Sequence, residues 1–359
     1  MPKADSISGA NTSLHGSERE IRILVDGHGG DDAPDVVLDA LEMALSPSFS
    51  ARFADRLSLG IVGQEEVIQP LLQARGIESK VSFIAATQVV EMCDSPSHAL
   101  RRKKGSSIHI GAAMVRDGEW DALVSAGNTG ALMAISKITL RMLPGIDRPA
   151  IASMVPAVNN GRTLMLDAGA NSECTSNHLV QFAIMGSCYM QAAEGIENPR
   201  VGLLNIGSED IKGTDVIKLT STKLAETELN YIGNVEGTDI SGNNVDVVVC
   251  DGFVGNVALK TMEGTARFLA DSIKAELTSG IVSKAGALLA RSALKRFKDR
   301  VNPSKYNGAP LLGLNGIVVK SHGGTDAEGF ASAIAVAGKQ VSENLTDHIT
   351  QSVQAMLEA

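Results

Sequence analysis

Aromatic residues are scarce in this 359-residue sequence: one Trp, three Tyr and eight Phe make up 3% of the chain. Proteins that bind single-stranded nucleic acid stack its bases on aromatic side chains, and binders of polyanions carry an excess of positive charge. Here 41 acidic residues outnumber 32 basic ones, which gives a net charge of −9. We therefore expect no nucleic-acid partner.

Cysteine is also rare, and Cys93, Cys174, Cys188 and Cys250 form no CxxC pair. This spacing argues against a disulfide framework or a zinc site, favours small apolar packing roles and is typical of a reducing cytoplasm. No apolar run reaches the roughly 20 residues that a membrane-spanning helix needs. Residues 1–20 are polar and lack the apolar core of a signal peptide. We expect a flexible extension at 1–20 and a folded domain at 21–359.

Glycine, by contrast, is abundant, with 36 residues against a usual share of about 7%. Glycine-rich clusters repeatedly follow a short apolar run and precede a helical periodicity. Strands are predicted at 21–26, 121–125, 162–167, 201–206, 245–250 and 316–320. This alternation predicts an α/β fold, a three-layer α/β/α arrangement around a mainly parallel sheet. The strand-to-helix turns of such a sheet lie at one edge, where we expect them to converge on a ligand.

Two segments interrupt the pattern. Residues 143–149 contain two prolines and could form a hinge or an ordinary loop. Residues 272–305 hold two successive helical stretches without a strand, the second at 284–300. That stretch is amphipathic, and residues 284–305 hold one acid, Asp299, against seven basic residues: Lys284, Arg291, Lys295, Arg296, Lys298, Arg300 and Lys305. It predicts contact with a membrane surface or an acidic protein, or else an ordinary packed helix with a solvated face.

Two turns are the best candidates for binding phosphate, because small residues before a helix expose backbone N–H groups at the positive end of its dipole. The first contains Ser125, Gly127, Thr129 and Gly130, with Asn128 as a side-chain donor. The second contains Gly252, Gly255 and Asn256, with Lys260 one helical turn further on. Either turn alone could serve only tight packing. His28 and His322 could each act on a proton or make a structural hydrogen bond.

Several familiar motifs are absent. The glycines at 27–30 lack the third glycine of GxGxxG, and the sequence has no GxxxxGK[ST], GxSxG or HExxH. These absences argue against a common nucleotide-binding loop, a serine hydrolase and a zinc protease. The basic run 101–104 could steer an anionic substrate or form a solvated helix face.

Ten motifs, in order over residues 21–337, together resemble the phosphate acyltransferase family of bacterial phospholipid synthesis. They are DGHGGDDAPDVV from Asp26, ALRRKKGSSI from Ala99, SAGNTGALMA from Ser125, GIDRPA from Gly145, LDAGAN from Leu166, PRVGLLNIGSEDIKG from Pro199, GNVEGTDI from Gly233, VCDGFVGNVALKTMEG from Val249, PLLGLNG from Pro310 and KSHGG from Lys320. The sequence departs from the family at Gly27-His28, where Ala-Met is usual, and at Ser208, where Glu is usual.

This resemblance implies a fold like that of phosphotransacetylase and isopropylmalate dehydrogenase, with a protruding helical hairpin. It implies transfer of a long-chain acyl group from acyl-carrier protein to inorganic phosphate, without cofactor or metal. The acyl phosphate would pass to a downstream membrane acyltransferase. The resemblance further implies a cytoplasmic homodimer that associates peripherally with the membrane. A short-chain phosphotransacylase that uses CoA thioesters, and a non-catalytic carrier-protein or membrane adaptor, remain alternatives.

The implied chemistry needs no covalent intermediate, because phosphate can attack a thioester directly if the protein holds it and stabilises the oxyanion. On this reading Asn128 and Lys260 stabilise charge, and His322 assists the leaving sulfur. Contacts with the carrier protein or the membrane are expected from Arg101, Arg102, Lys103, Leu288, Leu289, Arg291, Lys295, Phe297 and Lys298.

Overall fold

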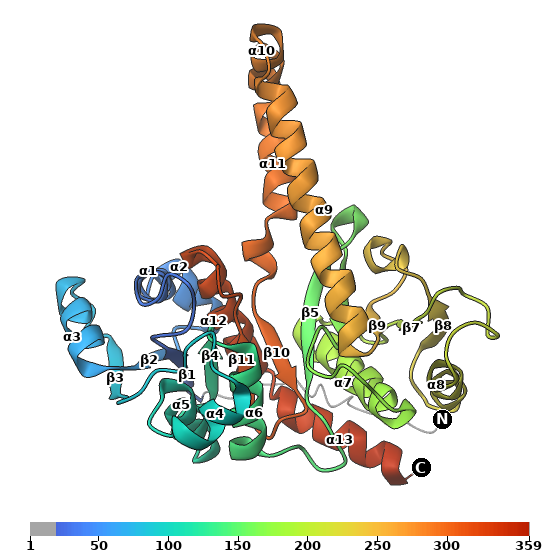
Figure 1. Cartoon of the computed structure of the whole chain (residues 1–359), viewed down its shortest axis with the longest axis horizontal. Helices are drawn as coiled ribbons and strands as arrows, with labels where there is room; N and C mark the ends of the chain where they lie inside the picture. Colours follow the sequence, from blue (N-terminus) through green and yellow to red (C-terminus); the bar gives the residue numbers. More distant parts are fainter. Residues whose placement is uncertain (1–18, 359) are drawn as a thin grey trace, which may run out of the picture.

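The computed structural model describes residues 19–358, which build an eleven-stranded sheet with helices on both faces (Figure 1). Of the predicted extension at 1–20, residues 1–18 lie outside the described part. The strands are β1 Ile21–Asp26, β2 Leu57–Gly63, β3 Val81–Ala85, β4 Ala122–Ser125, β5 Ala150–Pro156, β6 Arg162–Leu166, β7 Val201–Leu204, β8 Tyr231–Val235, β9 Val247–Val249, β10 Ala309–Leu312 and β11 Ile317–Lys320.

Thirteen α-helices are described in residues 19–358. They are α1 Asp35–Ala44, α2 Pro47–Ser50, α3 Glu65–Ala74, α4 Pro96–Arg102, α5 Ser107–Arg116, α6 Thr129–Leu140, α7 Ser176–Glu194, α8 Asp215–Ala225, α9 Gly252–Thr278, α10 Ile281–Leu289, α11 Arg291–Val301, α12 Ala327–Ser342 and α13 Leu345–Glu358. All six predicted strands are present, although β2, β3, β5, β8 and β10 were not predicted.

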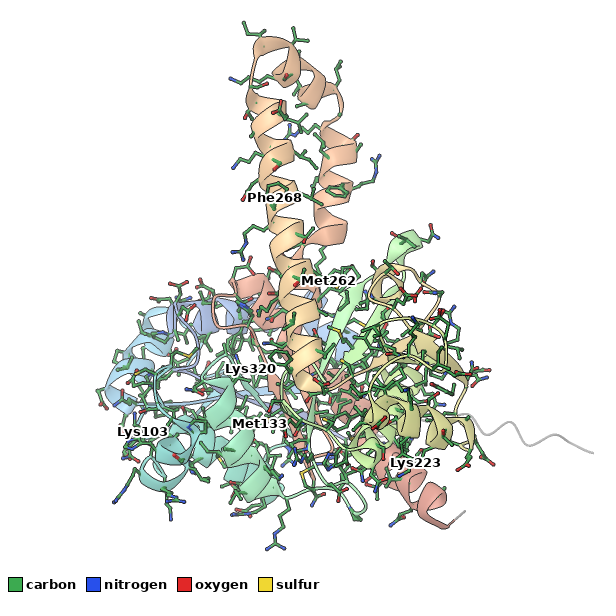
Figure 2. All side chains as sticks on the ribbon, turned by 45° about the vertical axis from the view of Figure 1, so that its right-hand side comes forward. Lys103, Met133, Lys223, Met262, Phe268 and Lys320 are labelled. Carbon is green, nitrogen blue, oxygen red and sulfur yellow. The ribbon has the colours of Figure 1, made fainter. Side chains whose placement is uncertain are left out.

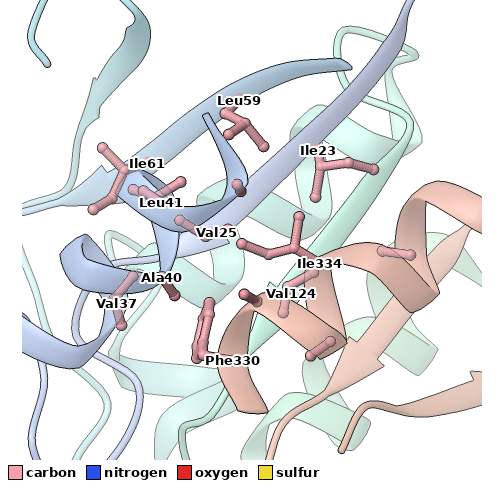
Figure 3. Packing of buried hydrophobic residues seen from close by; sticks show 14 of the residues in the cluster. Ile23, Val25, Val37, Ala40, Leu41, Leu59, Ile61, Val124, Phe330 and Ile334 are labelled. Carbon is pink, nitrogen blue, oxygen red and sulfur yellow. The ribbon is translucent and has the colours of Figure 1, made fainter. Parts of the chain in front are cut away.

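Side-chain alternation along the strands explains the three layers. In β1, Ile23 and Val25 face a core formed with α1 and α12, where Phe330 is fully buried (Figure 3). Leu24, between them, faces the opposite core, formed with α5 and α6. Successive residues of a strand point to opposite faces, so a run that is apolar throughout must be covered on both sides. The predicted three-layer α/β/α class is confirmed.

The strand directions correct one expectation. The sheet order is β3-β2-β1-β4-β11-β10-β5-β6-β9-β7-β8. β1, β2, β3, β4 and β11 are mutually parallel, and so are β6, β7, β8 and β9. β10 pairs antiparallel with both neighbours, and β5 is antiparallel to β6. The two parallel halves therefore run in opposite directions, and the prediction that every strand-to-helix turn lies at one edge is wrong.

A stagger between the halves nevertheless brings their carboxyl ends close. Along β10, Ala309 lies opposite Lys320 of β11, and Leu311 lies opposite Ile151 of β5. The Ile151 N–H in turn donates to the carboxylate of Asp167, just after β6 (3.0 Å). The ends of β11 and β6 thus differ by two residues along β10, about 7 Å, and lie three strand spacings apart, about 14 Å. The centre of the sheet is where loops from both halves meet.

The helical hairpin protrudes from this centre (Figures 1 and 2). Its first arm, α9, is one unbroken helix of 27 residues from Gly252, so the predicted boundary at 272 falls inside it. The predicted helix 284–300 is two helices, α10 and α11, that change direction at Ala290. No helix within residues 19–358 is both long and apolar enough to cross a membrane.

Candidate active site

Three strand ends of the first half meet around Asp26, the last residue of β1, which is 2% exposed. Its carboxylate accepts hydrogen bonds from the Ser125 hydroxyl at the end of β4 (2.7 Å) and from the His28 N–H (3.1 Å). The Gly127 N–H donates to the Ser125 hydroxyl oxygen (3.1 Å). The Ser321 N–H, after β11, donates to the Ser125 carbonyl (2.9 Å). This network fixes the turn that precedes α6.

The start of α6 presents free hydrogen-bond donors. The Asn128 side chain caps the helix by accepting from the Ala131 N–H (3.0 Å). The backbone N–H groups of Asn128, Thr129 and Gly130 have no acceptor within residues 19–358. Three such groups at the positive end of a helix dipole suit an oxyanion. The structure thus leaves the predicted anion-binding turn at 125–130 open.

Lys320, at the end of β11, is a site residue that the sequence reasoning did not select. It is 9% exposed, and its Nζ donates to the Ala126 carbonyl (3.1 Å) and to the Ser321 carbonyl. Burial lowers its pKa to about 8, although the carboxylates of Asp26 and Asp31 oppose that shift. An ammonium group has three N–H donors, and the third has no partner among the described residues. The only sequence signal was a lysine at the end of an apolar strand.

His322 stands beside Lys320 in an exposed turn. Its ring Nδ1 accepts from the Gly324 N–H (3.2 Å), and its backbone N–H donates to the Asn307 side-chain oxygen (2.9 Å). Burial and the positive charge of Lys260 lower its pKa, so the ring is neutral near pH 7. With Nδ1 acting as an acceptor, the neutral ring carries its proton on Nε2. No residue in the described range 19–358 accepts from this Nε2–H, so it can donate to a ligand.

Lys260 reaches the same region from the other half of the molecule. It lies about two turns into α9, is exposed, and pairs with Glu263 (2.7 Å). Both charges act on the pKa of His322, and Lys260 also acts on that of Lys320. Figure 2 places Lys320 beside the base of α9. Lys260 and Lys320, together with the neutral His322, thus form one positively charged cluster across the centre of the sheet.

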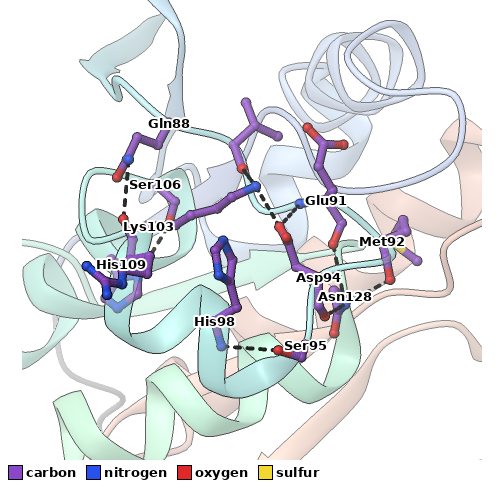
Figure 4. A network of polar contacts seen from close by, with 12 residues as sticks. Gln88, Glu91, Met92, Asp94, Ser95, His98, Lys103, Ser106, His109 and Asn128 are labelled. Carbon is purple, nitrogen blue, oxygen red and sulfur yellow. Dashed lines mark hydrogen bonds and ion pairs between the residues drawn. The ribbon is translucent and has the colours of Figure 1, made fainter.

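The Asn128 amide has a positioning role (Figure 4). Its Nδ2 donates to the carbonyls of Met92 (2.9 Å) and Asp94 (2.9 Å), with a longer contact to that of Glu91 (3.4 Å). Both amide protons are therefore used inside the protein, and the side-chain oxygen is used by the helix cap. The side chain ties the loop 91–94 to the start of α6. The amide therefore has no group left for an external ligand, whereas the backbone N–H of Asn128 has no acceptor within residues 19–358.

The basic run 101–104 contains one side chain that is held by the protein and others that are exposed. Lys103 pairs with Asp94 (2.6 Å) and donates to the Val89 carbonyl (2.7 Å), so it clamps the same loop from the other side (Figure 4). This pairing lowers the pKa of Asp94. Arg101 and Arg102 are exposed. Lys103 is thus held by the protein itself, and its predicted contact with the carrier protein or the membrane stays a prediction.

The second predicted phosphate turn, 251–256, is closed. Asp251 caps α9 by accepting from the Val254 N–H (2.8 Å), and the Gly252 N–H donates to the Asn171 carbonyl (2.7 Å). A Cβ on Gly252 would lie 2.8 Å from the Asn171 backbone, and one on Gly255 would collide with the Asp167 carbonyl. These two glycines permit close packing, so we leave them out of the proposed phosphate site.

Asp167 fills the corresponding turn after β6. Its carboxylate accepts from the backbone N–H groups of Ile151, Gly169, Ala170 and Asn171, and from the Asn171 side chain. Burial raises its pKa, and these donors oppose that shift. An internal carboxylate thus occupies the N–H groups that an external anion would need. Asn256 is exposed on α9, next to Gly169.

Other nucleophile and proton-transfer candidates have structural roles. Cys188 and Cys250 are buried, and burial raises the pKa of both, as it raises that of the half-buried Cys174 to about 12. Only Cys93 is exposed and so departs from the expected packing role.

The Nε2 of His28 accepts from the Gln64 N–H (2.8 Å), and burial lowers the pKa of this imidazole. No cluster of three or more His, Cys, Asp or Glu able to hold a metal occurs in the described residues.

The predicted hairpin contacts lie on α10 and α11, which protrude from the sheet (Figure 1). Leu288 and Leu289 are 69% and 89% exposed at the tip, and Phe297 is 50% exposed on α11. Arg291 and Lys295 are exposed on the same arm, whereas the Lys298 side chain lies outside the described residues. The hairpin therefore combines exposed apolar and basic side chains, as the sequence predicted.

Comparison with solved structures identifies the fold. A phosphotransacetylase from Streptococcus pyogenes matches with a TM-score of 0.57 and 16% identity, over 89% of this chain and 94% of that one. The EutD phosphotransacetylase from Staphylococcus aureus matches with a TM-score of 0.54 and 18% identity, over the same shares. The protein thus has the phosphotransacetylase-like α/β fold that the sequence predicted.

Sequence comparison identifies the family. Residues 21–348 match a protein family described as "fatty acid synthesis protein". A phosphate acyltransferase from Magnetococcus marinus is 48% identical over 340 residues, covering 93% of this chain and 95% of the relative. One from Paramagnetospirillum magneticum is 48% identical over 335 residues, covering 92% and 93%. The chain belongs to the fatty acid synthesis protein family, and the resemblance to phosphate acyltransferases is confirmed.

Proposed function

We propose that this protein is a phosphate acyltransferase that moves a long-chain acyl group from acyl-carrier protein to inorganic phosphate. The observation that carries the proposal is the set of unused donors at the sheet centre: the third N–H of Lys320 and the backbone N–H groups of Asn128, Thr129 and Gly130. The names of its relatives agree with this chemistry.

Phosphate binds between Lys320 and the start of α6. The buried ammonium supplies a full charge in a region of low dielectric, and the helix N-terminus supplies oriented N–H groups. Because Lys320 is fixed by the Ala126 and Ser321 carbonyls, its position does not change when the anion arrives. Preorganised donors of this kind stabilise charge without a reorganisation cost.

A phosphate oxygen then attacks the thioester carbonyl carbon. A C–O bond forms, the tetrahedral oxyanion collapses, and the C–S bond breaks with the electron pair leaving on sulfur. His322 Nε2–H and the Lys260 ammonium stabilise the developing negative charge. Since the imidazole is neutral, it acts as a hydrogen-bond donor, and the thiolate takes its proton from water. The products are an acyl phosphate and the free carrier thiol.

The described cysteines with resolved pKa shifts support direct transfer. Cys174, Cys188 and Cys250 all have pKa values raised by burial. A thiol is nucleophilic only as the thiolate, so none of the three is suited to form an acyl-enzyme. We propose a single displacement in which phosphate and the acyl thioester are bound together.

The hairpin tip suits a role for the enzyme at a membrane surface. The exposed tip, with Leu288 and Leu289 beside basic residues, suits peripheral contact with an anionic membrane surface. We propose that the protein acts in the cytoplasm as a homodimer at that surface. A membrane acyltransferase would consume the acyl phosphate there.

One assay separates this function from its alternatives. The protein is incubated with phosphate and palmitoyl-ACP, acetyl-CoA or no thioester, and acyl phosphate is trapped with hydroxylamine. We expect product from palmitoyl-ACP. Product from acetyl-CoA alone would identify a short-chain phosphotransacylase. No product from either thioester, with carrier protein or vesicles still bound, would identify an adaptor.

A further inference from the structure

Three neighbouring basic side chains at the end of α4 have no ionic partner among residues 19–358. They are Arg101, Arg102 and Lys104, and all three are exposed. The residue between them, Lys103, is held by Asp94 and the Val89 carbonyl. The structure thus separates one structural lysine from three free cations. Of the two acids on the supporting loop 91–94, Asp94 is paired with Lys103, and Glu91 makes no ion pair among the described residues.

These three side chains, which we call the α4 patch, lie at the rim of the catalytic site. α4 begins at Pro96, whose side chain would be 2.8 Å from a Cβ placed on Gly130 at the start of α6. With a rise of 1.5 Å per residue, Arg101 lies about 8 Å along the helix axis from Pro96. A ligand on the α4 patch is therefore within short reach of the free N–H groups of α6.

We propose that the α4 patch docks an acidic carrier protein, whose flexible prosthetic arm then delivers the acyl thioester to the site. This inference rests on the proposed function. The chain carries a net charge of −9, so an acidic partner is repelled overall and needs a local positive surface. Such a surface steers encounter and fixes orientation, and its effect falls with ionic strength.

The composition of the α4 patch favours a protein over a membrane. In α4, Ala99 is buried and Leu100 is partly buried, so the patch exposes charge without large apolar side chains. At the hairpin tip, by contrast, Ile281 and Val282 are 88% and 86% exposed. Stable membrane binding combines an apolar insertion with basic residues. The two basic surfaces therefore suit different partners.

The test compares charge reversal at the α4 patch, R101E/R102E/K104E, with the matched control K80E/K212E/K218E. The control lysines are exposed and belong to other elements. KM is measured for palmitoyl-ACP and for palmitoyl-pantetheine, which lacks the acidic protein, and binding of the carrier protein is followed by fluorescence anisotropy. We expect the patch variant to raise KM for palmitoyl-ACP about tenfold or more and to weaken carrier binding. It should leave palmitoyl-pantetheine turnover unchanged, as the control should for both substrates.

The remaining outcomes are decisive. Unchanged KM for palmitoyl-ACP would overturn the inference, as would an equal loss with both thioesters, which would place the patch in catalysis. Loss of binding to anionic vesicles without a change in KM would assign it to lipid. If the wild type forms no acyl phosphate yet binds carrier protein through the patch, the docking inference stands and the proposed function fails.

Discussion

The Nζ of Lys320 lies 3.1 Å from the carbonyl oxygen of Ala126, so the end of β11 is bonded directly to the turn that opens α6. A buried cation and a helix N-terminus thereby become one unit. Neither element alone is specific for phosphate, since turns before helices are common and a buried lysine costs stability. Together they place a full positive charge beside three free N–H groups.

Replacing Lys320 with Met should stabilise the fold at neutral pH. Burial lowers the folded pKa to about 8, below an unfolded value near 10.4. Below pH 8 both states are protonated and the folded state bears the full cost of burying the charge. The cost declines as pH rises from about 8 to 10.4, because the unfolded state then binds more protons. We expect a gain in unfolding free energy of at most about 3 kcal/mol at pH 7, less the lost hydrogen bonds.

The measurement is urea unfolding of Lys320→Met and wild type between pH 6.5 and 10.5. The advantage of the variant should shrink across the upper part of this range. A difference that is constant with pH would show that Lys320 is not a buried ammonium in the folded protein.

At His322, the substitutions Ala and Gln should separate hydrogen bonding from proton transfer. Its Nδ1 is held by the Gly324 N–H, and its pKa is lowered, so the neutral ring offers Nε2–H. We expect His322→Ala to lower kcat by about 10- to 100-fold. His322→Gln should lower kcat less, because the glutamine amide can also donate a hydrogen bond. Steady-state kinetics with palmitoyl-ACP at pH 6–9 checks both. Equal inactivity of the two variants would favour proton transfer by His322.

Asn128 should act through the loop 91–94. Asn128→Ser preserves a helix cap but removes the donors to the Met92 and Asp94 carbonyls, whereas Asn128→Ala removes both. We expect both variants to raise KM for phosphate, and only Ala to lose a further ~1 kcal/mol of stability through the cap. Thermal unfolding and phosphate kinetics measure the two effects. Unchanged KM in both variants would contradict the positioning role of the Asn128 side chain.

Two glycines of α9 provide a matched pair. A Cβ on Gly255 would collide with the Asp167 carbonyl, whereas one on Gly264 meets nothing within 4 Å. Gly255→Ala should therefore destabilise the protein by roughly 1–3 kcal/mol, and Gly264→Ala should stabilise it by up to about 1 kcal/mol. Chemical unfolding measures the free energy of unfolding of both variants. If Gly255→Ala is as stable as the wild type, the packing role assigned to Gly255 is wrong.

Sequence reasoning succeeded where local signals match the structure. β1 was predicted to its terminal residues because its apolar run ends in a glycine cluster. Five of the described strands, β2, β3, β5, β8 and β10, were not predicted. Of these, β5 and β10 do not lead directly into an α-helix, and β10 has only four residues. These two strands contain the antiparallel pairings that reverse the second half, so its direction could not be anticipated.

In the candidate site, too, the sequence predicted some features and missed others. The turn at 125–130 was predicted because its small residues precede a helix, and it is open in the structure. The turn at 251–256 has the same local pattern, but Asp167 and Asn171 pack against Gly252 and Gly255. Local sequence does not distinguish a glycine that admits a ligand from one that admits a neighbouring strand end. Likewise, the burial of Lys320 arises from tertiary packing.

The phosphate dependence of acyl phosphate formation in Lys320→Met, with Lys218→Met as the control, tests the central claim most directly. Lys218 is exposed on α8. The account predicts that K320M raises KM for phosphate at least about 30-fold, as expected for losing a charged hydrogen bond worth 2 kcal/mol or more, while K218M behaves as wild type. A K320M enzyme with wild-type KM for phosphate would contradict it.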